Sequence, residues 1–356
     1  MAENCADPFV AVTPLYAFSS DSEELKIGEL FRLVKYQRNS LPPLPADDIL
    51  LKHLLLYEPD YLLWQRADLD DPTDLRAFLN PAEFTGDGSA SKLEATLSVL
   101  FHFPATNLFR LLRLFKPGRV TAGDTFVISC ETRSEEGIWE TTFGKRCSEM
   151  AIDYTSLGAP NGSYTLLSSE VPFFNLFSKA LLPQLESLQK AGYLSAPPPL
   201  EIALLLYNED ERMPRMAVLN ALTALEALLT NESNAELSYR LSLRVANLLE
   251  SDDALRLNRF TEMKEFYDLR SKIIHGSASK LSPKLQNRLQ MVDSLREILR
   301  RTILSVMALF LDDKSTEVRL DELLDQLVFD EAKRKEVQKL AAKFMHLEGT
   351  SSDSVH

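Results

Sequence analysis

Hydrophobic residues follow two different periods in the two halves of this chain. In the first half, residues 9–18 (FVAVTPLYAF) and 119–132 (RVTAGDTFVISCET) are rich in Val, Phe, Ile and Thr, which favours β-strands. Residues 107–115 (NLFRLLRLF) place apolar side chains at helical spacing and stop at a Lys-Pro-Gly breaker. Residues 1–170 are therefore expected to form a domain that mixes helices and strands.

The second half has a helical period almost without a break. A Ser-x-x-Glu capping box, Ser233 to Glu236, is expected to open a helix that buries leucine and valine side chains at a spacing of three or four residues. Gly276 is placed to follow the end of another helix, and Pro283 to lie in the first turn of the last long one. Besides the helix that the capping box opens, the predicted helices cover residues 173–190, 200–208, 213–230, 258–275 and 283–311.

This pattern predicts an α+β protein with a mixed α/β domain at residues 1–170 and an all-α helical bundle at residues 171–312. Residues 313–356 are expected to form a charged helix, about residues 320–346, and a polar tail.

The chain has 356 residues, of which 45% are hydrophobic, enough to bury the cores of two domains. Its start has no basic segment followed by an apolar one, and no apolar run reaches the ~18 residues that a membrane span requires. We therefore expect a cytoplasmic protein without membrane contact.

Metal and nucleotide sites have little support in the sequence. The three cysteines (Cys5, Cys130, Cys147) lack the spacing of a zinc site, and His53 and His102 each stand alone among apolar neighbours. The glycines of residues 85–91 do not form a phosphate-binding motif. We expect no metal and no cofactor, which leaves a metal- or nucleotide-dependent enzyme in the first half as the weakest hypothesis.

The net charge of −13 disfavours non-specific binding to nucleic acid, but it is unevenly distributed. Residues 1–170 have 15 basic and 25 acidic side chains, whereas residues 171–312 have 17 of each. The predicted bundle is thus the least acidic region, and any contact with RNA would need a local basic patch.

Arg270 is the most informative residue of the predicted bundle. On a helical wheel, Met263 and Ile274 fall about 20° and 40° from it, so it is expected in the middle of an apolar face. A desolvated guanidinium is costly unless a carboxylate, a phosphate or several acceptors satisfy it. Arg270 should therefore have a buried partner or line a pocket or an interface.

His275 stands at the end of the same helix, where free carbonyl groups favour a protonated imidazole. Glu226 lies among leucines on a helix that is apolar nearly all round, and it requires a cation. The candidates are Arg270, Arg240 and Arg244, the last two being four residues apart on one helix face. Such a pair can fix helix register only, or it can belong to an active site.

The segment Arg270-Ser-Lys-Ile-Ile-His275 matches the R-x4-H motif of the HEPN superfamily. With Ala224 to Leu229, Glu236 to Ala246 and Tyr267 to Ser271 in the same order, residues 171–312 resemble the ApeA-like branch of that superfamily. The resemblance implies a bundle that forms a homodimer across a cleft and cleaves RNA without a metal ion. It also implies a role in anti-phage or toxin–antitoxin defence, with a regulatory partner or trigger.

On this resemblance Arg270 and His275 are the catalytic pair, and Ser271, Tyr267, Glu226, Arg240 and Arg244 support them. Single-stranded RNA would supply its own 2′-hydroxyl as the nucleophile, and a 2′,3′-cyclic phosphate would form. Ser271 stands where many relatives have Asn, Asp or His. Some members of the superfamily have lost catalysis, so the alternative is a non-catalytic module for dimerisation or for binding a ligand or protein.

Overall fold

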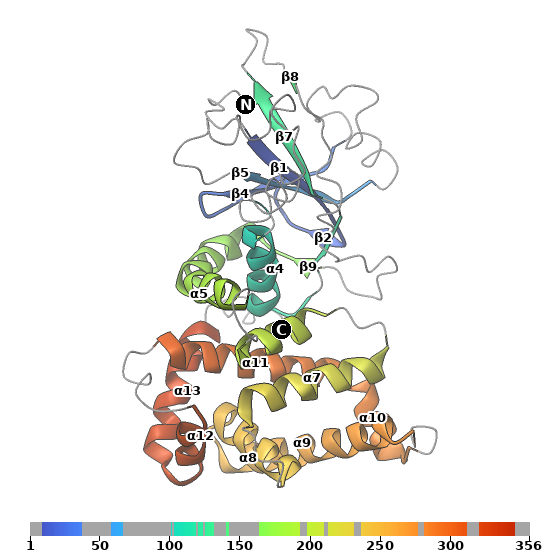
Figure 1. Ribbon diagram of the computed structural model, residues 1–356, viewed down its shortest axis with the longest axis vertical. Coiled ribbons are helices and arrows are strands. Elements are labelled where there is room, and N and C mark those ends of the chain that lie inside the picture. Colours follow the sequence, from blue (N-terminus) through green and yellow to red (C-terminus); the bar gives the residue numbers. More distant parts are fainter. Residues whose placement is uncertain are drawn as a thin grey trace, which may run out of the picture. The chain divides into compact units, whose positions relative to one another are not determined.

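A computed structural model describes residues 9–37, 58–66, 101, 103–118, 120–123, 125–131, 140–141, 164–192, 198–209, 213–230, 236–276, 281–311 and 320–345. These residues form an antiparallel β-sheet followed by a series of helices, so the α+β prediction is confirmed (Figure 1). The chain divides into two compact units at residues 178 and 179, and residues 114–116 group with the second unit.

The first unit is built on one sheet with the strand order β3-β4-β5-β1-β7-β8. The central strand β1 pairs antiparallel with β5 on one side and with β7 on the other, and β6 pairs with its end. Ala11, Val12 and Thr13 are all buried, so both faces of β1 are covered. The strands of this sheet are β1 (Phe9–Tyr16), β3 (Glu24–Ile27), β4 (Phe31–Lys35), β5 (Tyr61–Arg66), β6 (Thr121–Ala122), β7 (Phe126–Glu131) and β8 (Glu140–Thr141).

The predicted elements of this half are present. The two predicted strand regions contain β1, β6 and β7, and the predicted helix is α4 (Phe103–Phe115). A short parallel pair, β2 (Phe18–Ser19) with β9 (Tyr164–Thr165), lies outside the main sheet. The Tyr164 hydroxyl donates a hydrogen bond of 2.6 Å to the Leu112 carbonyl of α4, which ties that pair to the helix.

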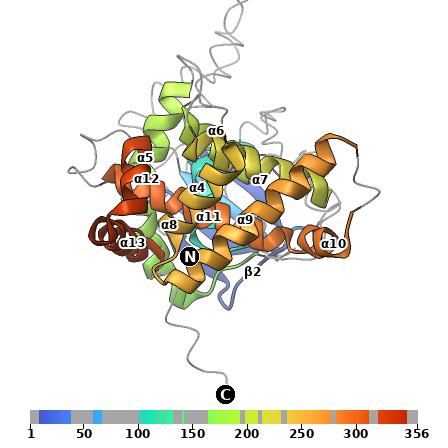
Figure 2. The same ribbon diagram turned by 90° about the horizontal axis from the view of Figure 1, so that it is seen from below.

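The second unit is helical throughout its described residues (Figures 1 and 2). After the short 3-10 turn η3 (Ser168–Glu170), the chain forms α5 (Val171–Gly192), α6 (Pro199–Asn208), α7 (Pro214–Leu229), α8 (Leu237–Leu249), α9 (Asp253–Ile274), α10 (Pro283–Gln290), α11 (Val292–Leu311), α12 (Leu320–Phe329) and α13 (Glu331–Met345).

Helices α7 and α11 form the centre of this unit. α7 contacts α6, α8, α9, α10, α11 and α12, and α11 contacts α6, α8 and α13. Half of the 16 residues of α7 are buried, among them Val218, Leu222 and Leu225. The prediction of a central helix at residues 213–230 is confirmed, because a helix that is apolar nearly all round is stable only with neighbours on most sides.

The predicted capping box is wrong. Ser233 lies outside the described residues, and Glu236 precedes the first residue of α8, where the motif would need it as the third helical residue. Its backbone is left-handed, with φ 55°, and its side chain makes no capping hydrogen bond. The buried side chains of this helix are nevertheless as predicted for Leu241, Val245 and Leu248, while Leu237 is only half-buried.

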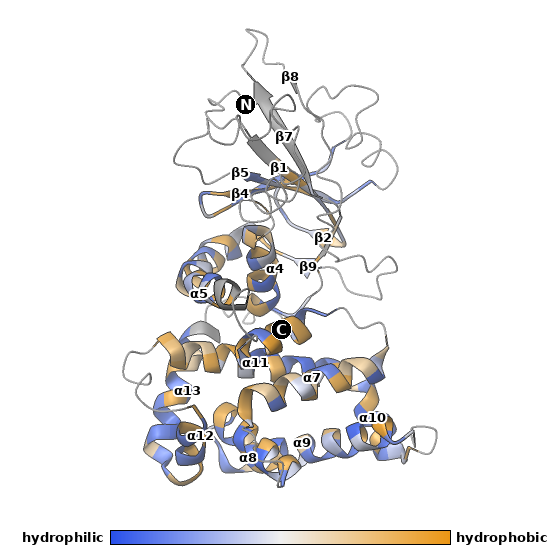
Figure 3. Cartoon of the chain, viewed as in Figure 1, coloured by the Kyte–Doolittle hydropathy of each residue, from blue (hydrophilic) through white to orange (hydrophobic). Residues whose placement is uncertain are grey.

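The last long helix and the tail helix are each divided in two. The helix predicted over residues 283–311 breaks at Met291, whose N–H lies within hydrogen-bonding distance of both the Asn287 and the Arg288 carbonyls. The tail helix breaks at Asp330, whose carboxylate accepts from the Lys333 N–H and caps α13. Figure 3 shows hydrophilic and hydrophobic residues alternating around α12 and α13, as amphipathic helices require.

Candidate active site on helix α9

Helix α9 carries both members of the R-x4-H motif. Asp252 caps its first turn by accepting hydrogen bonds from the Ala254 and Leu255 N–H groups, at 2.8 and 3.1 Å. The helix ends at Ile274 with His275 as its C-cap residue, and Gly276 follows with φ 68°, a left-handed conformation that glycine adopts without strain. The predicted end of this helix is therefore confirmed, but its start is five residues earlier than predicted.

Arg270 lies at the border of the buried face of α9 and not at its centre. The buried apolar residues of the helix are Met263, Phe266 and Leu269, whereas Ile274 is 53% exposed. The apolar face is thus rotated away from the predicted one. The Arg270 side chain is 24% exposed, so it is not fully removed from solvent.

Glu226 of α7 is the partner of Arg270, as one of the predicted alternatives had it. The Nη2 of Arg270 donates to the Glu226 carboxylate at 3.2 Å, and the Glu226 side chain is 18% exposed. The Arg270 guanidinium also lies 5.4 Å from the centre of the Tyr267 ring, a cation–π contact. Its Nε is buried and has no hydrogen-bond partner among the described residues, so the pair leaves Arg270 incompletely satisfied.

Tyr267 stays protonated at neutral pH. Burial raises the pKa of its hydroxyl group, and the nearby Glu226 carboxylate raises it further. Tyr267 is therefore a neutral hydrogen-bond donor next to the pair of charges, and its ring covers one side of the guanidinium.

His275 and Ser271 lie on the exposed end of α9. The Ser271 carbonyl accepts from the His275 N–H at 3.0 Å, and both residues are exposed. The histidine ring can thus meet a ligand from solvent, while its backbone is held by the last turn of the helix. Arg270, Tyr267 and Glu226 form one cluster, and His275 is one and a half turns further along the same helix.

Arg244 does not belong to this cluster, and its predicted role as a partner of Glu226 is wrong. It is 2% exposed and donates from Nε and Nη2 to the Asp325 carboxylate of α12, at 3.0 and 2.5 Å. Its Nη1 donates to the Leu229 carbonyl at the end of α7. Arg240, one turn earlier on α8, is half-buried and has no ion pair among the described residues. Neither arginine supports Arg270 directly.

A second set of charges, which joins α9 to its neighbouring helices, was missed by sequence reasoning. The Glu250 carboxylate accepts from Arg259 and Arg301, at 2.9 and 3.3 Å. These and the remaining contacts form one network of alternating charges, made of Glu250, Arg259, Glu262, Glu265, Lys284, Arg288 and Arg301. The spacing of Arg259 and Glu262 was a signal for one of these pairs, but pairs between helices leave no period in the sequence.

Hydrogen bonds from Lys284 and Arg288 stabilise the charged form of the Glu265 carboxylate in this network. Burial by itself would raise the pKa of Glu265, but hydrogen bonds from Lys284 and Arg288 outweigh it and lower the pKa below its usual value of 4.5. The Lys284 and Arg288 bonds measure 2.7 and 2.5 Å. This carboxylate is therefore charged at neutral pH and joins α9 to α10.

Metal and membrane chemistry have no support in the described residues. Within them, no group of three or more His, Cys, Asp or Glu side chains is placed to hold a metal ion. None of their helices combines the length and the apolar character that a bilayer span requires. Cys5, Cys147, His53 and His102 lie outside the described residues.

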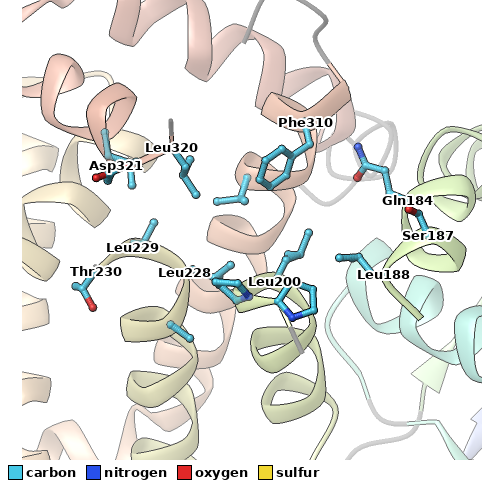
Figure 4. A pocket seen from close by; sticks show the side chains of 15 residues that line it. Gln184, Ser187, Leu188, Leu200, Leu228, Leu229, Thr230, Phe310, Leu320 and Asp321 are labelled. Atoms are coloured by element: carbon cyan, nitrogen blue, oxygen red, sulfur yellow. The ribbon is translucent and has the colours of Figure 1, made fainter. Parts of the chain in front are cut away.

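A pocket of about 950 Å³ lies between helices of the second unit (Figure 4), and its lining includes Ala227, the residue that follows Glu226 in the chain. Leu200, Leu228 and Leu324 are among its apolar walls, and the Phe310 ring, 49% exposed, lies beside them. The polar residues that line it include Gln184, Thr230 and Asp321 but no basic side chain. Neither Arg270 nor His275 belongs to this lining, so the pocket is not the site predicted from the sequence.

Comparisons of the chain with protein-family models, with curated proteins and with solved structures gave no match. The interpretation of the site therefore depends on its own residues.

Proposed function

We propose that the chain is a metal-independent endoribonuclease of HEPN type that works as a homodimer, with Arg270 and His275 as its catalytic residues. One observation carries the proposal: the two residues of the R-x4-H motif remain partly or fully exposed on α9, although Arg270 is tethered to Glu226. A guanidinium that has a single ion pair and N–H donors left unused among the described residues can still receive a phosphate group.

The proposed reaction needs a base, an acid and a cation. One His275 removes the proton of the 2′-hydroxyl, and the 2′-oxygen then attacks the adjacent phosphorus atom. The bond from phosphorus to the 5′-oxygen breaks, and a second His275, from the other copy, protonates that oxygen. Arg270 stabilises the negative charge that develops on the phosphoryl oxygens. The products are a 2′,3′-cyclic phosphate and a 5′-hydroxyl end.

Tyr267 and Glu226 have positioning roles in this proposal. The Glu226 carboxylate and the Tyr267 ring restrict the rotation of the Arg270 side chain, which reduces the entropy lost when the phosphate binds. Ser271 supplies the carbonyl that holds the His275 backbone.

The proposal is tested by incubating the purified protein with a single-stranded RNA oligonucleotide in EDTA. We expect cleavage by the natural protein and a loss of about 10²–10⁴-fold in rate for His275→Ala and Arg270→Ala. Lys272→Ala is the matched control, since Lys272 is exposed on the same turn and has no part in the reaction. Equal cleavage by His275→Ala and the natural protein would contradict the proposal.

A second candidate is a non-catalytic module for dimerisation or for binding a partner. It is favoured by the Glu226–Arg270 ion pair, which neutralises the one cation that the reaction requires. Overproduction in cells separates the two candidates. A growth defect that Arg270→Ala abolishes supports the nuclease, whereas equal growth with both proteins supports the non-catalytic module.

A further inference from the structure

Helix α13 is unusually basic for a chain with a net charge of −13. It contains four lysines and one arginine but only two glutamates, Glu331 and Glu336. Arg334 is buried and donates to the Leu327 carbonyl at 2.9 Å, so its charge is used inside the unit. The positive charge that α13 exposes to solvent therefore comes from its four lysines.

Three of these lysines lie on one exposed face. Lys335, Lys339 and Lys343 follow one another at intervals of four residues, which places them about 40° apart around the helix. Buried Val337 and Ala341 lie on the other side. The three exposed lysines, here called the lysine face, span about 12 Å along the helix axis.

The two glutamates of α13 reduce the charge of the lysine face but leave it net positive, since Glu331 and the exposed Glu336 stand against three lysines. Glu331 pairs with Lys335 at 2.6 Å, but both side chains are about two-thirds exposed, and such surface pairs contribute little and exchange easily. Helix α12 carries Asp321, Glu322 and Asp325. Of these, Asp325 is already paired with the buried Arg244.

Phe329, two residues before the start of α13, is 89% exposed. It is the last residue of α12, and Asp330 then caps α13. A phenylalanine left almost wholly in solvent loses the benefit of burial, and an exposed aromatic ring can stack with an unpaired base.

We infer that the lysine face and Phe329 together bind single-stranded RNA, the lysines contacting phosphate groups and the phenylalanine stacking on a base. This inference deepens the proposed function, since it assigns the surface on which the substrate is held outside the catalytic site. It also explains how an acidic protein can bind a polyanion, because binding is local and needs only one basic surface.

The test measures binding separately from cleavage. The full chain with His275→Ala, which leaves the RNA uncut, is titrated into a fluorescently labelled oligouridylate at several salt concentrations. Replacing Lys335, Lys339 and Lys343 by Gln should reduce the slope of log affinity against log salt by about 2, since each contact to a single strand contributes about 0.7. Phe329→Ala should weaken binding by about 5- to 100-fold at every salt concentration.

A variant with the same change of charge elsewhere is the control. Lys26, Lys179 and Lys264 are exposed, and replacing all three by Gln should leave the salt slope unchanged. All variants carry substitutions at exposed positions, and circular dichroism checks that they are folded.

The inference is overturned if the control variant loses as much affinity as the lysine-face variant, or if the lysine-face variant keeps the natural slope. It is also overturned if the lysine face binds anionic lipid vesicles but not RNA. The natural protein could also bind RNA through the lysine face and yet cleave none. That result would contradict the nuclease proposal but support the RNA-binding surface.

Discussion

Two arginines one turn apart on α8 have very different surroundings. Arg244 is buried and donates to the Leu229 carbonyl and the Asp325 carboxylate, whereas Arg240 is half-buried and unpaired within the described residues. Arg244→Ala should lower the free energy of unfolding by about 2–4 kcal/mol, because a buried carbonyl loses its donor and α12 loses its tether.

Arg240→Ala should change the same free energy by less than about 0.5 kcal/mol. Urea unfolding of the two variants measures both values. Equal losses would show that the Arg244 contacts do not stabilise the unit.

The Glu265 carboxylate makes stability depend on pH. Because its folded pKa lies below its ordinary value of 4.5, the charged form contributes stability that is fully present above about pH 4.5 and is lost as the pH falls through the folded value. Glu265→Gln should therefore cost about 1.5–3 kcal/mol at neutral pH, and this cost should shrink below pH 4.5. Denaturant titrations at a series of pH values measure it, and a cost independent of pH would refute the assignment.

At the residue scale the sequence predicted the partner of Arg270 but not its exposure. Arg270 was one of three candidate cations for Glu226, with Arg240 and Arg244, and the Arg270 and Glu226 side chains do meet. The wheel placed Arg270 in the centre of the apolar face because it counted Ile274, which is exposed. An apolar residue in the last turn of a helix stays exposed where no neighbouring helix covers that turn. The period of the sequence does not show how far a neighbouring helix extends.

At the element scale, the capping residue of α9 offers a direct test of helix initiation. The Asp252 carboxylate accepts from two free N–H groups of the first turn. Asp252→Ala should lower the melting temperature through a loss of about 0.5–2 kcal/mol. Glu236→Ala is the control, since Glu236 precedes α8 in the chain without a capping hydrogen bond, and it should cost much less. A larger loss from Glu236→Ala would be inconsistent with these caps.

The presence of the long helices was predicted better than the residues at which they begin and end. The helices around residues 173–190, 200–208 and 213–230 are present with nearly the predicted bounds. The breaks at Met291 and Asp330 were not predicted, because the apolar period continues across both. Tertiary contacts explain the first break: Arg288 holds α10 to Glu262 and Glu265 of α9, while α11 enters the core of the unit.

At the scale of the molecule, composition and period predicted the α+β class and the change to helices near residue 171. They did not predict that α12 and α13 belong to the helical unit, where α13 contacts α11 and α12 contacts α8. These helices are joined to the rest by Arg244 and by Gln338, whose amide donates to the Asn247 and Glu250 carbonyls. Such contacts connect distant segments and leave no local pattern.

The proposed reaction requires two copies of His275, so we expect the full chain to form a homodimer. Sedimentation equilibrium should give twice the mass of 40.2 kDa at the concentrations where RNA is cleaved. Cleavage by a protein that stays monomeric at these concentrations would require a different general acid.

The central claim, that the substrate's own 2′-hydroxyl is the nucleophile, is tested most directly with two oligonucleotides. One is all RNA, and the other has the same sequence with 2′-deoxyribose at every position that is cleaved in the first. In EDTA, we expect the natural protein to cut only the first and to leave a 2′,3′-cyclic phosphate. Cleavage of the deoxy positions, or products with a 5′-phosphate, would contradict the account.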